Sequence, residues 1–588
     1  MESTTIFKNS TDETSKNSTR TLQKTMLLIV FLSLSTLLVA AFLKELCPRH
    51  GRDHPMTPPL TLSPHPVIKN ACTNTLYPSL CFTTLSSSPA SMKATKPQQI
   101  LEIAINRTVK SVLSSRLEII SLFTSQDLKA QAKNALKDCV EMLDQTLYEL
   151  GQAVDDLHDV PESIGFIRRS YGNLKTLLSA AMTNENTCID GFTDVEEADP
   201  EIPKALKEYL QTLVTPISHM ISNCLAMVKY METINREEAL NGQKILISKM
   251  PPDGFPEWMM SGDRKLMEMA PEIRPDLIVA GDGSGHYHTI GEAVRMAPNR
   301  SMNRFVIKVK AGIYNENVEI SREKENIMLI GGGMNSTMIT GCKNFIDGFS
   351  TFTSATLTVV GDRFLARDLT IINTSGPQKH QAVALRVTSN SAFYRCNFSS
   401  YQDTLYAHSL CQFYRECTIQ GTIDFIFGNA AAVFQNCLIL VRKPNPGQKN
   451  MVTAQGREDP NQNTGISLQN CTIVAAPDLT VASRSSFSTF LGRPWRNHSR
   501  TMVMKSYLGD LIHPQGWCKW NDYSTLDAIE YIEYMNVGPG SDTNHRVTWG
   551  GYRRNCSKDI AKKFTVGEFL HGTDDWLEST GFPVFYGS

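Results

Sequence analysis

The segments FYRC (393–396), FYREC (413–417), FQNC (434–437) and LQNC (468–471) repeat one short motif that ends in cysteine. Their cysteines follow one another in steps of 21, 20 and 34 residues. The surrounding chain consists of short apolar runs rich in Val, Ile, Phe and Thr, separated by Gly and Asn, a pattern typical of strands. A period near 20 residues, with an insertion in the last interval, predicts the stacked coils of a parallel β-helix over residues 275–588.

The repeat also aligns polar side chains. Gln381 and Gln402 are 21 residues apart, as are Asp403 and Asp424. Equivalent positions on neighbouring coils lie about 4.8 Å apart, so two amides and two carboxylates should meet on one face. The flanking sequences YQDTLY and GTIDFIFGNA surround each acid with aromatic and apolar residues, which perturb carboxyl pKa values. The pattern predicts a catalytic pair of aspartates, and the alternative is that each aspartate caps a turn between coils.

The preceding region, residues 68–231, is poor in glycine and helical in pattern. Apolar residues such as Leu136, Cys139 and Leu143 recur at three- and four-residue steps, which places them on one helix face. Similar stripes elsewhere in the region predict an all-α bundle of about four helices. On this pattern alone, a structural or folding-aid bundle remains an equal alternative to a regulatory domain.

Five cysteines lie in the helical region. Cys72 and Cys81 are close enough in sequence to staple an N-terminal hairpin, and Cys139 with Cys188 would clamp two long helices. Cys224 is left over. The region is therefore predicted to contain two disulfides.

The first 67 residues contain one long apolar run, residues 26–43, which is uncharged and can just span a bilayer. Basic residues in the 1–25 segment favour a transmembrane signal anchor with a cytosolic tail, followed by a linker over residues 44–67. The alternative is a signal peptide that is cleaved late. Both readings send the chain into the secretory pathway. Glycosylation sequons support this compartment and occur at Asn106, Asn335, Asn373, Asn397, Asn470, Asn497 and Asn555.

Charge and linker composition add two expectations. The 588 residues carry 58 Lys and Arg against 59 Asp and Glu, so no basic field indicates binding to nucleic acid. Residues 232–274 include a stretch in which Pro, Gly and charged residues interrupt all periodicity, which predicts a linker between two domains. Arg264 and Lys265 form a basic pair within it.

The second half of the chain resembles plant pectin methylesterases. The matching motifs are GIYNENV (312–318), QAVALR (381–386), YQDTLY (401–406), GTIDFIFGNAAAVFQNC (421–437), TAQGREDPNQNTG (453–465) and LGRPW (491–495). The resemblance implies a right-handed parallel β-helix that needs no metal or organic cofactor. It also implies hydrolysis of the methyl esters of galacturonate residues in homogalacturonan, the backbone of pectin, with release of methanol.

The resemblance further implies roles for individual residues. Asp424 would be the nucleophile, Asp403 would act first as acid and then as base, and Arg493 would orient Asp424. Gln381 and Gln402 would stabilise the oxyanion. The side chains expected to bind the sugar are Thr351, Gln381, Tyr406, Arg493, Trp495 and Trp517, with a buried core position as the alternative for Trp517.

The helical region resembles the pectin methylesterase inhibitor family. The segments that carry the likeness are ACTNTLYPSLC (71–81), ALKDCVEMLDQTLYEL (135–150) and LSAAMTNENTCIDGF (178–192). The resemblance implies the same two disulfides and an intramolecular contact with the esterase, either autoinhibitory or folding-assisting. It also marks Arg264 and Lys265 as a site for a subtilisin-like processing protease, with an uncut linker as the alternative.

Cys411 stands where the family usually has arginine, and it could disturb the pairing of the neighbouring cysteines. Cys417 with Cys437, on adjacent coils, is the first choice for a disulfide in the β-helix.

A pectin lyase or polygalacturonase shares the fold and the polymer, and a non-enzymatic wall-binding protein or inhibitor is a third class. The acid pair lacks a third clustered carboxylate and Arg493 stands in a sugar-binding GRPW motif, which favours the esterase over a lyase or polygalacturonase. The intact acid pair favours it over the non-enzymatic class.

Overall fold

The computed structural model describes residues 66–570 and 587, with gaps at 126–127, 159–163, 199–203, 243–273, 485, 523–525 and 555. The predicted anchor at 26–43, both of its flanking segments and the predicted processing pair Arg264 and Lys265 lie outside the described residues. Within those residues, no helix is both long and apolar enough to cross a bilayer.

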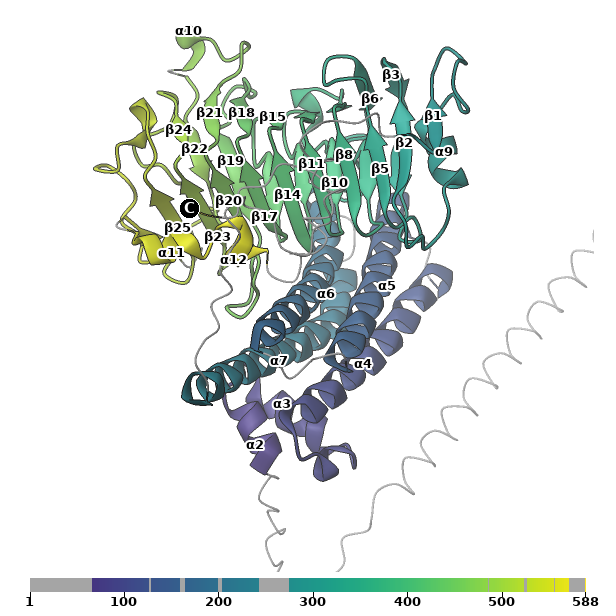
Figure 1. The fold of residues 1–588 in the computed structure, drawn as a ribbon, viewed down its shortest axis with the longest axis vertical. Coiled ribbons are helices and arrows are strands. Elements are labelled where there is room, and N and C mark those ends of the chain that lie inside the picture. The colour runs from purple at the N-terminus through teal and green to yellow at the C-terminus, as the bar shows by residue number, and fades with distance from the viewer. Residues whose placement is uncertain are drawn as a thin grey trace, which may run out of the picture. The chain divides into compact units, whose positions relative to one another are not determined.

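The N-terminal domain is helical (Figure 1). Its helices are α2 (Pro66–Thr73), α3 (Pro78–Ser86), α4 (Pro97–Ser125), α5 (Ala130–His158), α6 (Ile164–Ala198) and α7 (Lys204–Gly242), with a 3₁₀ turn at Ser91–Lys93. The prediction of about four helices covers the long helices α4 to α7 and omits the two short ones. Helix α7 also continues past Met231, where the sequence pattern had placed the start of the linker.

Both predicted disulfides of the bundle are present. Cys72 pairs with Cys81 and joins α2 to α3, while Cys139 pairs with Cys188 and joins α5 to α6. Cys224 stays unpaired within the described residues and is buried. The second disulfide fixes α5 against α6, the helix pair with the most extensive packing in the bundle.

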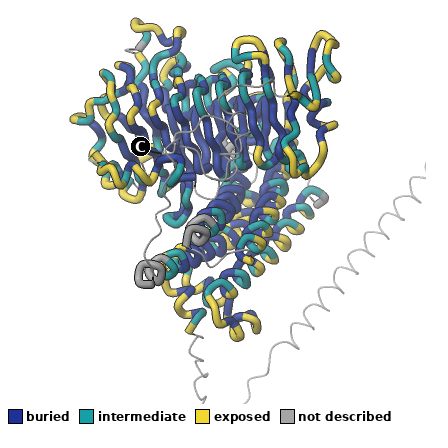
Figure 2. The backbone as a smooth tube through the Cα atoms, in the orientation of Figure 1, coloured by how far each residue is buried: buried dark blue, intermediate teal, exposed yellow. Residues whose placement is uncertain are grey.

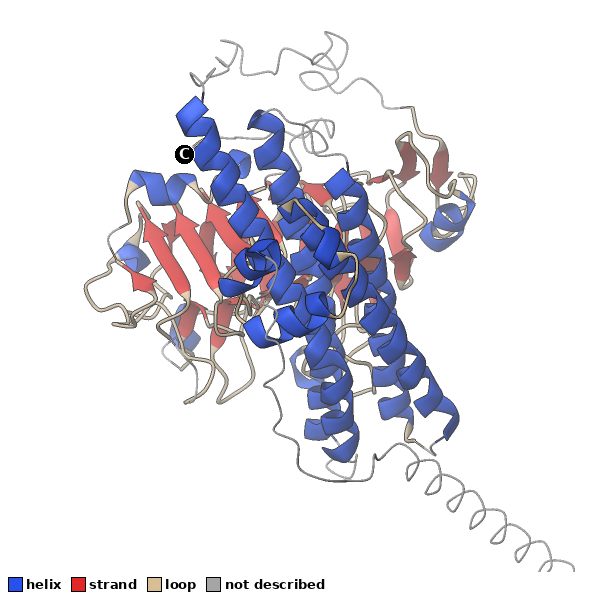
Figure 3. Cartoon of the chain, turned by 90° about the horizontal axis from the view of Figure 1, so that it is seen from below, coloured by secondary structure: helices blue, strands red, loops and turns tan. Residues whose placement is uncertain are grey.

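The C-terminal domain is a parallel β-helix, as predicted (Figure 3). Its first sheet runs in the order β1 (Leu277–Val279), β2 (Phe305–Val309), β5 (Ile327–Ile330), β8 (Phe364–Arg367), β11 (Ser391–Tyr394), β14 (Cys411–Arg415), β17 (Ala431–Gln435), β20 (Gly465–Gln469), β23 (Arg500–Met504), β25 (Glu530–Tyr534) and β26 (Tyr552–Arg553). The second runs β22 (Thr489–Gly492), β19 (Asn450–Gln455), β16 (Ile426–Gly428), β13 (Leu405–Ala407), β10 (Leu385–Val387), β7 (Leu357–Val359) and β4 (Val318–Ile320). The third runs β24 (Tyr507–Leu508), β21 (Thr472–Ala475), β18 (Leu438–Val441), β15 (Thr418–Gly421), β12 (Asn397–Ser399), β9 (Thr370–Asn373), β6 (Thr337–Gly341) and β3 (Gly312–Asn315).

Neighbours within a sheet come from successive coils, because each full coil gives one strand to each sheet. Buried apolar side chains fill the inside of the coils. Figure 2 accordingly shows much of the backbone of the coils in dark blue, the colour of buried residues. Short helices flank the coils: α9 (Ile290–Met296), α10 (Val481–Arg484), α11 (Lys558–Lys562) and α12 (Val566–Phe569). The apolar ladder inside and the backbone ladder along each sheet therefore fix the same coil-to-coil register.

The predicted disulfide between Cys417 and Cys437 is not formed. Both are buried free thiols in a ladder that also includes Cys396 and Cys471. Cys417 interacts with neighbours on both sides, Cys396 and Cys437, so the stacking selects no single pair. Thiols also donate to carbonyl oxygens of the preceding coil, at 3.5 Å from Cys417 to Phe393, 3.6 Å from Cys437 to Tyr414 and 3.4 Å from Cys471 to Phe434.

Cys411 does not join this ladder. It packs in a second apolar cluster together with Phe413 and Val433, whereas Cys417 belongs to the interior of the coils. Its sulfur lies 4.0 Å from Oγ1 of Thr176 on α6. The position that departs from the family pattern therefore faces the helical domain.

Two glutamates are buried inside the helical bundle, on α5 and α6. Burial raises the pKa of Glu149 and that of Glu185 to about 8. Asn184 donates to Glu149 at 2.7 Å and Thr146 donates to Glu185 at 2.9 Å, which opposes the effect of burial. Ionising these carboxyl groups in the folded bundle is costly, because neither has an adjacent cation in hydrogen-bond contact within the described residues.

We therefore expect the bundle to lose stability as pH rises. The unfolded carboxyl groups ionise near pH 4.3, so the stabilising contribution is complete below that pH and is lost as pH rises through about 8. The loss is up to about 1.4 kcal/mol per pH unit and ionising group in this window. Thermal unfolding of the full chain, followed by helical circular dichroism from pH 4 to 9, measures it.

Glu149→Gln should flatten this pH dependence, and Asp155→Asn on the exposed side of the same helix should leave it unchanged. A wild-type midpoint that is equal at pH 5 and pH 8.5 would contradict the prediction.

Candidate active site

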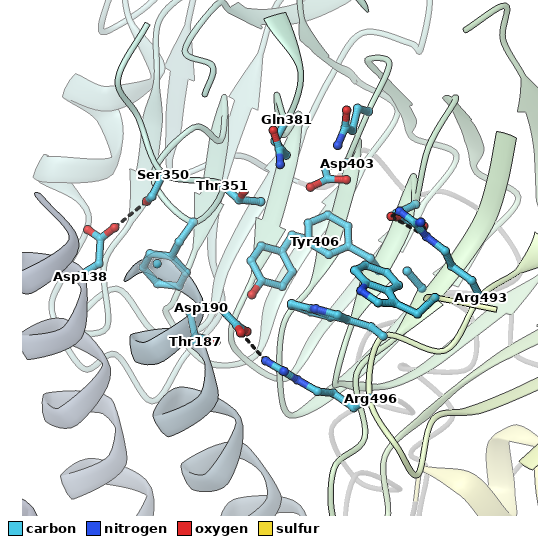
Figure 4. Close-up of a pocket in the computed structure, with 18 residues that line it drawn as sticks. Asp138, Thr187, Asp190, Ser350, Thr351, Gln381, Asp403, Tyr406, Arg493 and Arg496 are labelled. Atoms are coloured by element: carbon cyan, nitrogen blue, oxygen red, sulfur yellow. Dashed lines mark hydrogen bonds and ion pairs between the residues drawn. The ribbon is translucent and has the colours of Figure 1, made fainter. Parts of the chain in front are cut away.

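A cavity of about 460 Å³ lies next to β10, β13 and β16 (Figure 4). Most of the site residues predicted from the sequence line this cavity. The predicted residues Thr351, Gln381, Gln402, Asp403, Tyr406, Asp424, Arg493 and Trp495 all line it. The other lining residues are Asp138, Thr187, Asp190, Gly191, Ser350, Phe352, Phe427, Ala454, Arg496 and Trp520. The coil register therefore brings the two amides and the two carboxylates together.

The two aspartates lie in turns that lead into neighbouring strands of the second sheet. Asp403 has φ 63° and Asp424 has φ 49°, both in the left-handed region that costs a non-glycine residue free energy. The amide of Asp403 donates to the carbonyl of Ile423 on the next coil at 3.0 Å, which stacks one turn on the other. Both carboxylates are nearly buried, with 7% and 5% of Asp403 and Asp424 exposed.

The two glutamines occupy matching positions one coil apart. Gln381 and Gln402 form an isolated parallel bridge, as their 21-residue spacing predicts. Within the described residues, the buried Oε1 atom of Gln381 has no hydrogen-bond partner. A buried amide oxygen without a partner is costly, and it can accept a hydrogen bond from a donor group placed beside it.

Arg493 grips Asp424 with two nitrogens. Its Nε donates to Oδ1 at 2.9 Å and its Nη2 to Oδ2 at 2.5 Å, a bidentate charge-assisted pair. Burial raises the pKa of Asp424, and the charge of Arg493 acts in the opposite direction. The fork also fixes the carboxylate plane, so Asp424 is held in one orientation beside Asp403.

Aromatic rings form a wall of the cavity. Tyr406 and Phe427, in register on adjacent strands, stack with their centroids 4.2 Å apart. Trp495 lies 6.0 Å from Phe427, and Trp520 lies 6.5 Å from Trp495. Such faces suit the apolar faces of sugar rings, and they leave the carboxylates as the polar centre of the site.

The prediction that Trp517 contacts the sugar is wrong. Trp517 is 1% exposed, packs against Tyr531, and donates its indole N–H to Glu533 at 3.2 Å. Three residues further on, Trp520 takes the cavity position, with the guanidinium of Arg493 at 4.1 Å from its ring centroid. Sequence reasoning missed Trp520 because no repeat or motif distinguishes it from Trp517.

Helix α6 borders the cavity with a row of polar contacts. Its contact residues are spaced three or four positions apart, which puts them on one helix face. The pairs are Thr176 with Asn463 at 2.8 Å, Ser179 with Gln462 at 3.2 Å, Thr183 with Asn429 at 2.9 Å, Thr187 with His408 at 2.8 Å, and Asp190 with Arg496 in an ion pair. This small polar stripe was a sequence signal that the search for apolar periodicity passed over.

Helix α5 adds a contact at the other side of the cavity, where Ser350 donates to Asp138 at 2.5 Å (Figure 4). Burial raises the pKa of Asp138 to about 6, and the hydrogen bond from Ser350 opposes that effect. The two disulfide-linked helices thus place Asp138, Thr187 and Asp190 in the lining of the cavity. Side chains of both domains therefore line the cavity.

The coiled sheets and the buried acid pair in an aromatic cleft define the class of parallel β-helix proteins with an acidic active site. A family model for pectinesterase matches residues 276–573, and a model for the plant invertase/pectin methylesterase inhibitor domain matches residues 66–227. The chain belongs to the pectinesterase family, whose members are carboxylic ester hydrolases, and it carries an N-terminal domain of the inhibitor family.

Curated relatives match almost the whole chain. Pectinesterase 2 of Arabidopsis thaliana is 46% identical and the match covers 89% of this chain and 90% of the relative. Pectinesterase/pectinesterase inhibitor U1 of Solanum lycopersicum is 45% identical, with 94% and 95% covered. Among solved structures, the pectin methylesterase from carrot is 53% identical with a TM-score of 0.53, and the match covers 54% of this chain and all of that one.

The different positions of two tryptophans lead to a prediction. Trp520→Phe should raise KM for polymeric ester substrate about tenfold with little change in Tm, because a large aromatic surface of the cleft is reduced. Trp517→Phe should lower Tm and leave KM nearly unchanged, because it removes a buried hydrogen bond to Glu533. Steady-state kinetics and thermal unfolding of the two variants measure the contrast, and the reverse pattern would return Trp517 to the cleft.

Proposed function

We propose that this chain hydrolyses the methyl esters of galacturonate residues in pectin and releases methanol and a polymer carboxylate. The observation that supports this best is the pair Asp403 and Asp424 on adjacent coils, with Arg493 bound to one of them and two glutamine amides beside them. The names of the relatives agree with this substrate.

In the proposed reaction, Asp424 attacks the ester carbonyl carbon and the carbonyl oxygen becomes an oxyanion. The amides of Gln381 and Gln402 donate hydrogen bonds to this oxyanion, an interaction typically worth a few kcal/mol. The tetrahedral intermediate collapses to an acyl-enzyme anhydride, and Asp403 protonates the departing methoxide. Asp403 then takes a proton from water, which attacks the anhydride and frees Asp424.

Assigning different roles to two aspartates requires different surroundings. Arg493 binds Asp424 with its guanidinium fork, which favours the ionised carboxylate and offsets part of the cost of burial. The same fork directs one carboxylate toward the substrate position. Asp403, nearly buried one coil away, takes the acid role in this proposal.

The Asp424→Asn variant should lose turnover by about 10⁴-fold or more, because an amide of nearly the same shape cannot attack the ester. Asp403→Asn should also be severe, because the leaving group then lacks its proton donor. Methanol release from methylated pectin measures both, with Tm confirming the fold. Activity of Asp424→Asn within tenfold of wild type would refute the nucleophile assignment.

For the helical domain we propose autoinhibition, since Thr187 and Asp190 of α6 and Asp138 of α5 line the same cavity as the acid pair. Tethering can raise the effective concentration of the bundle to the millimolar range, so even weak contacts would stay occupied. Cutting the linker by a subtilisin-like protease would let the bundle leave by dilution. The rival role is assistance in folding and transit.

The uncut chain distinguishes these roles. Replacing Arg264 and Lys265 with alanine should yield a chain that stays intact by mass spectrometry and has a specific activity at least about tenfold below that of the cut protein. A protease site engineered at the same position should restore the activity. Equal activities of uncut and cut protein would exclude autoinhibition.

We further propose that the chain reaches the cell wall through the secretory pathway, with residues 26–43 as a membrane anchor before processing. The oxidised disulfides of the bundle support an oxidising compartment. Asn373 is an exception among the sequons, because its amide donates to carbonyl oxygens of the buried interior and is inaccessible to glycan transfer.

A further inference from the structure

Two arginines of the β-helix domain face carboxylates that belong to the helical domain. Arg496 forms an ion pair with Asp190 of α6 and lies 3.9 Å from Glu458 of its own domain. Nη2 of Arg386 lies 3.7 Å from the carboxylate of Glu141 on α5. The proposed mechanism uses neither arginine.

Arg386 is held in an unusual state for a cation. Its side chain is 5% exposed, and its guanidinium lies 3.3 Å from the centroid of Phe352. Among the described residues, its Nε and Nη1 atoms have no hydrogen-bond partner. A buried guanidinium with two unused donors is costly, and a planar carboxylate is the group that its fork matches best.

Strand register puts Arg386 in line with the aromatic wall. Arg386 on β10 pairs with Tyr406 on β13, which pairs with Phe427 on β16. Since neighbouring strands lie about 4.8 Å apart, the cation lies one coil beyond the stacked rings. Arg496 follows β22, which lies on the other side of β13 and β16 from β10 in the same sheet, and it lines the cavity next to Trp495. The two cations therefore flank the acid pair along the axis of the coils.

The geometry points to Arg386 and Arg496 as specificity-determining residues that bind free carboxylates of the polyuronate on the two sides of the methyl ester being hydrolysed. Glu141 and Asp190 of the helical domain occupy the positions of those carboxylates and thereby mimic a de-esterified stretch of substrate. The inference rests on the proposed function, from which it takes the polymer. It adds that the cleft selects a methyl ester with free carboxylates on both sides.

The chemistry of the two substrate groups explains the selection. A free uronate carboxylate accepts two parallel charge-assisted hydrogen bonds from a guanidinium, whereas its methyl ester is neutral and accepts more weakly. Departure of the bundle leaves Arg386 without Glu141 and Arg496 without Asp190. A substrate carboxylate restores these interactions, so the cleft favours an ester flanked by acids over one flanked by esters.

The test uses the full chain with a protease site engineered in the linker, cut and diluted to nanomolar concentration for kinetics. Calorimetry on the cut protein measures Kd for unesterified hexagalacturonate, a readout that does not depend on methanol release. Kinetics compare two hexamers, one fully methylated and one with a single internal ester among free acids. Arg496→Gln and the charge-conserving Arg386→Lys are compared with Arg553→Gln, a control on β26 whose side chain is 52% exposed.

We expect either cleft variant to raise Kd for the unesterified hexamer about tenfold or more, and to lower kcat/KM for the singly esterified hexamer by a similar factor through KM. The fully methylated hexamer should change less than about twofold, and Arg553→Gln should match wild type throughout. In the uncut chain, Asp190→Asn should raise basal activity.

Equal losses on both hexamers would overturn the inference in favour of a positioning role. If the arginine variants leave Kd for the unesterified hexamer unchanged while Asp190→Asn makes the uncut chain more active, the arginines only bind the helical domain. That result would overturn the inference. A cut wild-type protein that binds the acid hexamer through both arginines but releases no methanol would refute the proposed function and keep the inference.

Discussion

The in-register stacking of one coil on the next is the constraint on which the site depends. Parallel backbone pairing holds Gln381 opposite Gln402 and Tyr406 opposite Phe427, so residues about 20 positions apart become neighbours. A slip of one residue would turn each strand's side chains to the other face. The buried ladders of apolar side chains prevent that slip, because a slipped coil would place polar residues inside.

The turns between coils contain residues in strained, left-handed backbone conformations, and the stacking of the coils holds them there. Residues directly before the stacked cysteines, such as Arg395, Glu416 and Asn436, have positive φ, and so do Asp403 and Asp424. A left-handed conformation costs a non-glycine residue of order 1 kcal/mol and persists where the surrounding structure determines it. The two aspartates thus occupy a type of turn that the coils use repeatedly, and the cavity around them distinguishes them from the other turns.

The repeat made much of this architecture predictable. It gave the coil period, the alignment of Asp403 with Asp424, and the alignment of the two glutamines, because a periodic fold converts sequence spacing into position. The prediction of a disulfide between Cys417 and Cys437 was wrong because the same periodicity gives each thiol two equivalent neighbours. Trp517 and Trp520 were not separable, since both lie in the irregular segment between β24 and β25. The contact face of α6 was missed because its residues are small and polar, and apolar periodicity reports only the face toward the bundle's own core.

The cleft row from Arg386 through Tyr406 to Phe427 has a fixed pitch of about 4.8 Å, set by backbone hydrogen bonds and independent of the side chains. A linear polymer laid along it brings its own repeat distance. Unless the coil spacing equals the repeat distance of the polymer, successive sugar units lie at different positions relative to the coils. Only a short segment of the polymer can then be aligned with the protein side chains at once. A cleft of this kind recognises which of a few neighbouring sugar units are esterified. Shifting the polymer by one unit places a different sugar unit beside the acid pair.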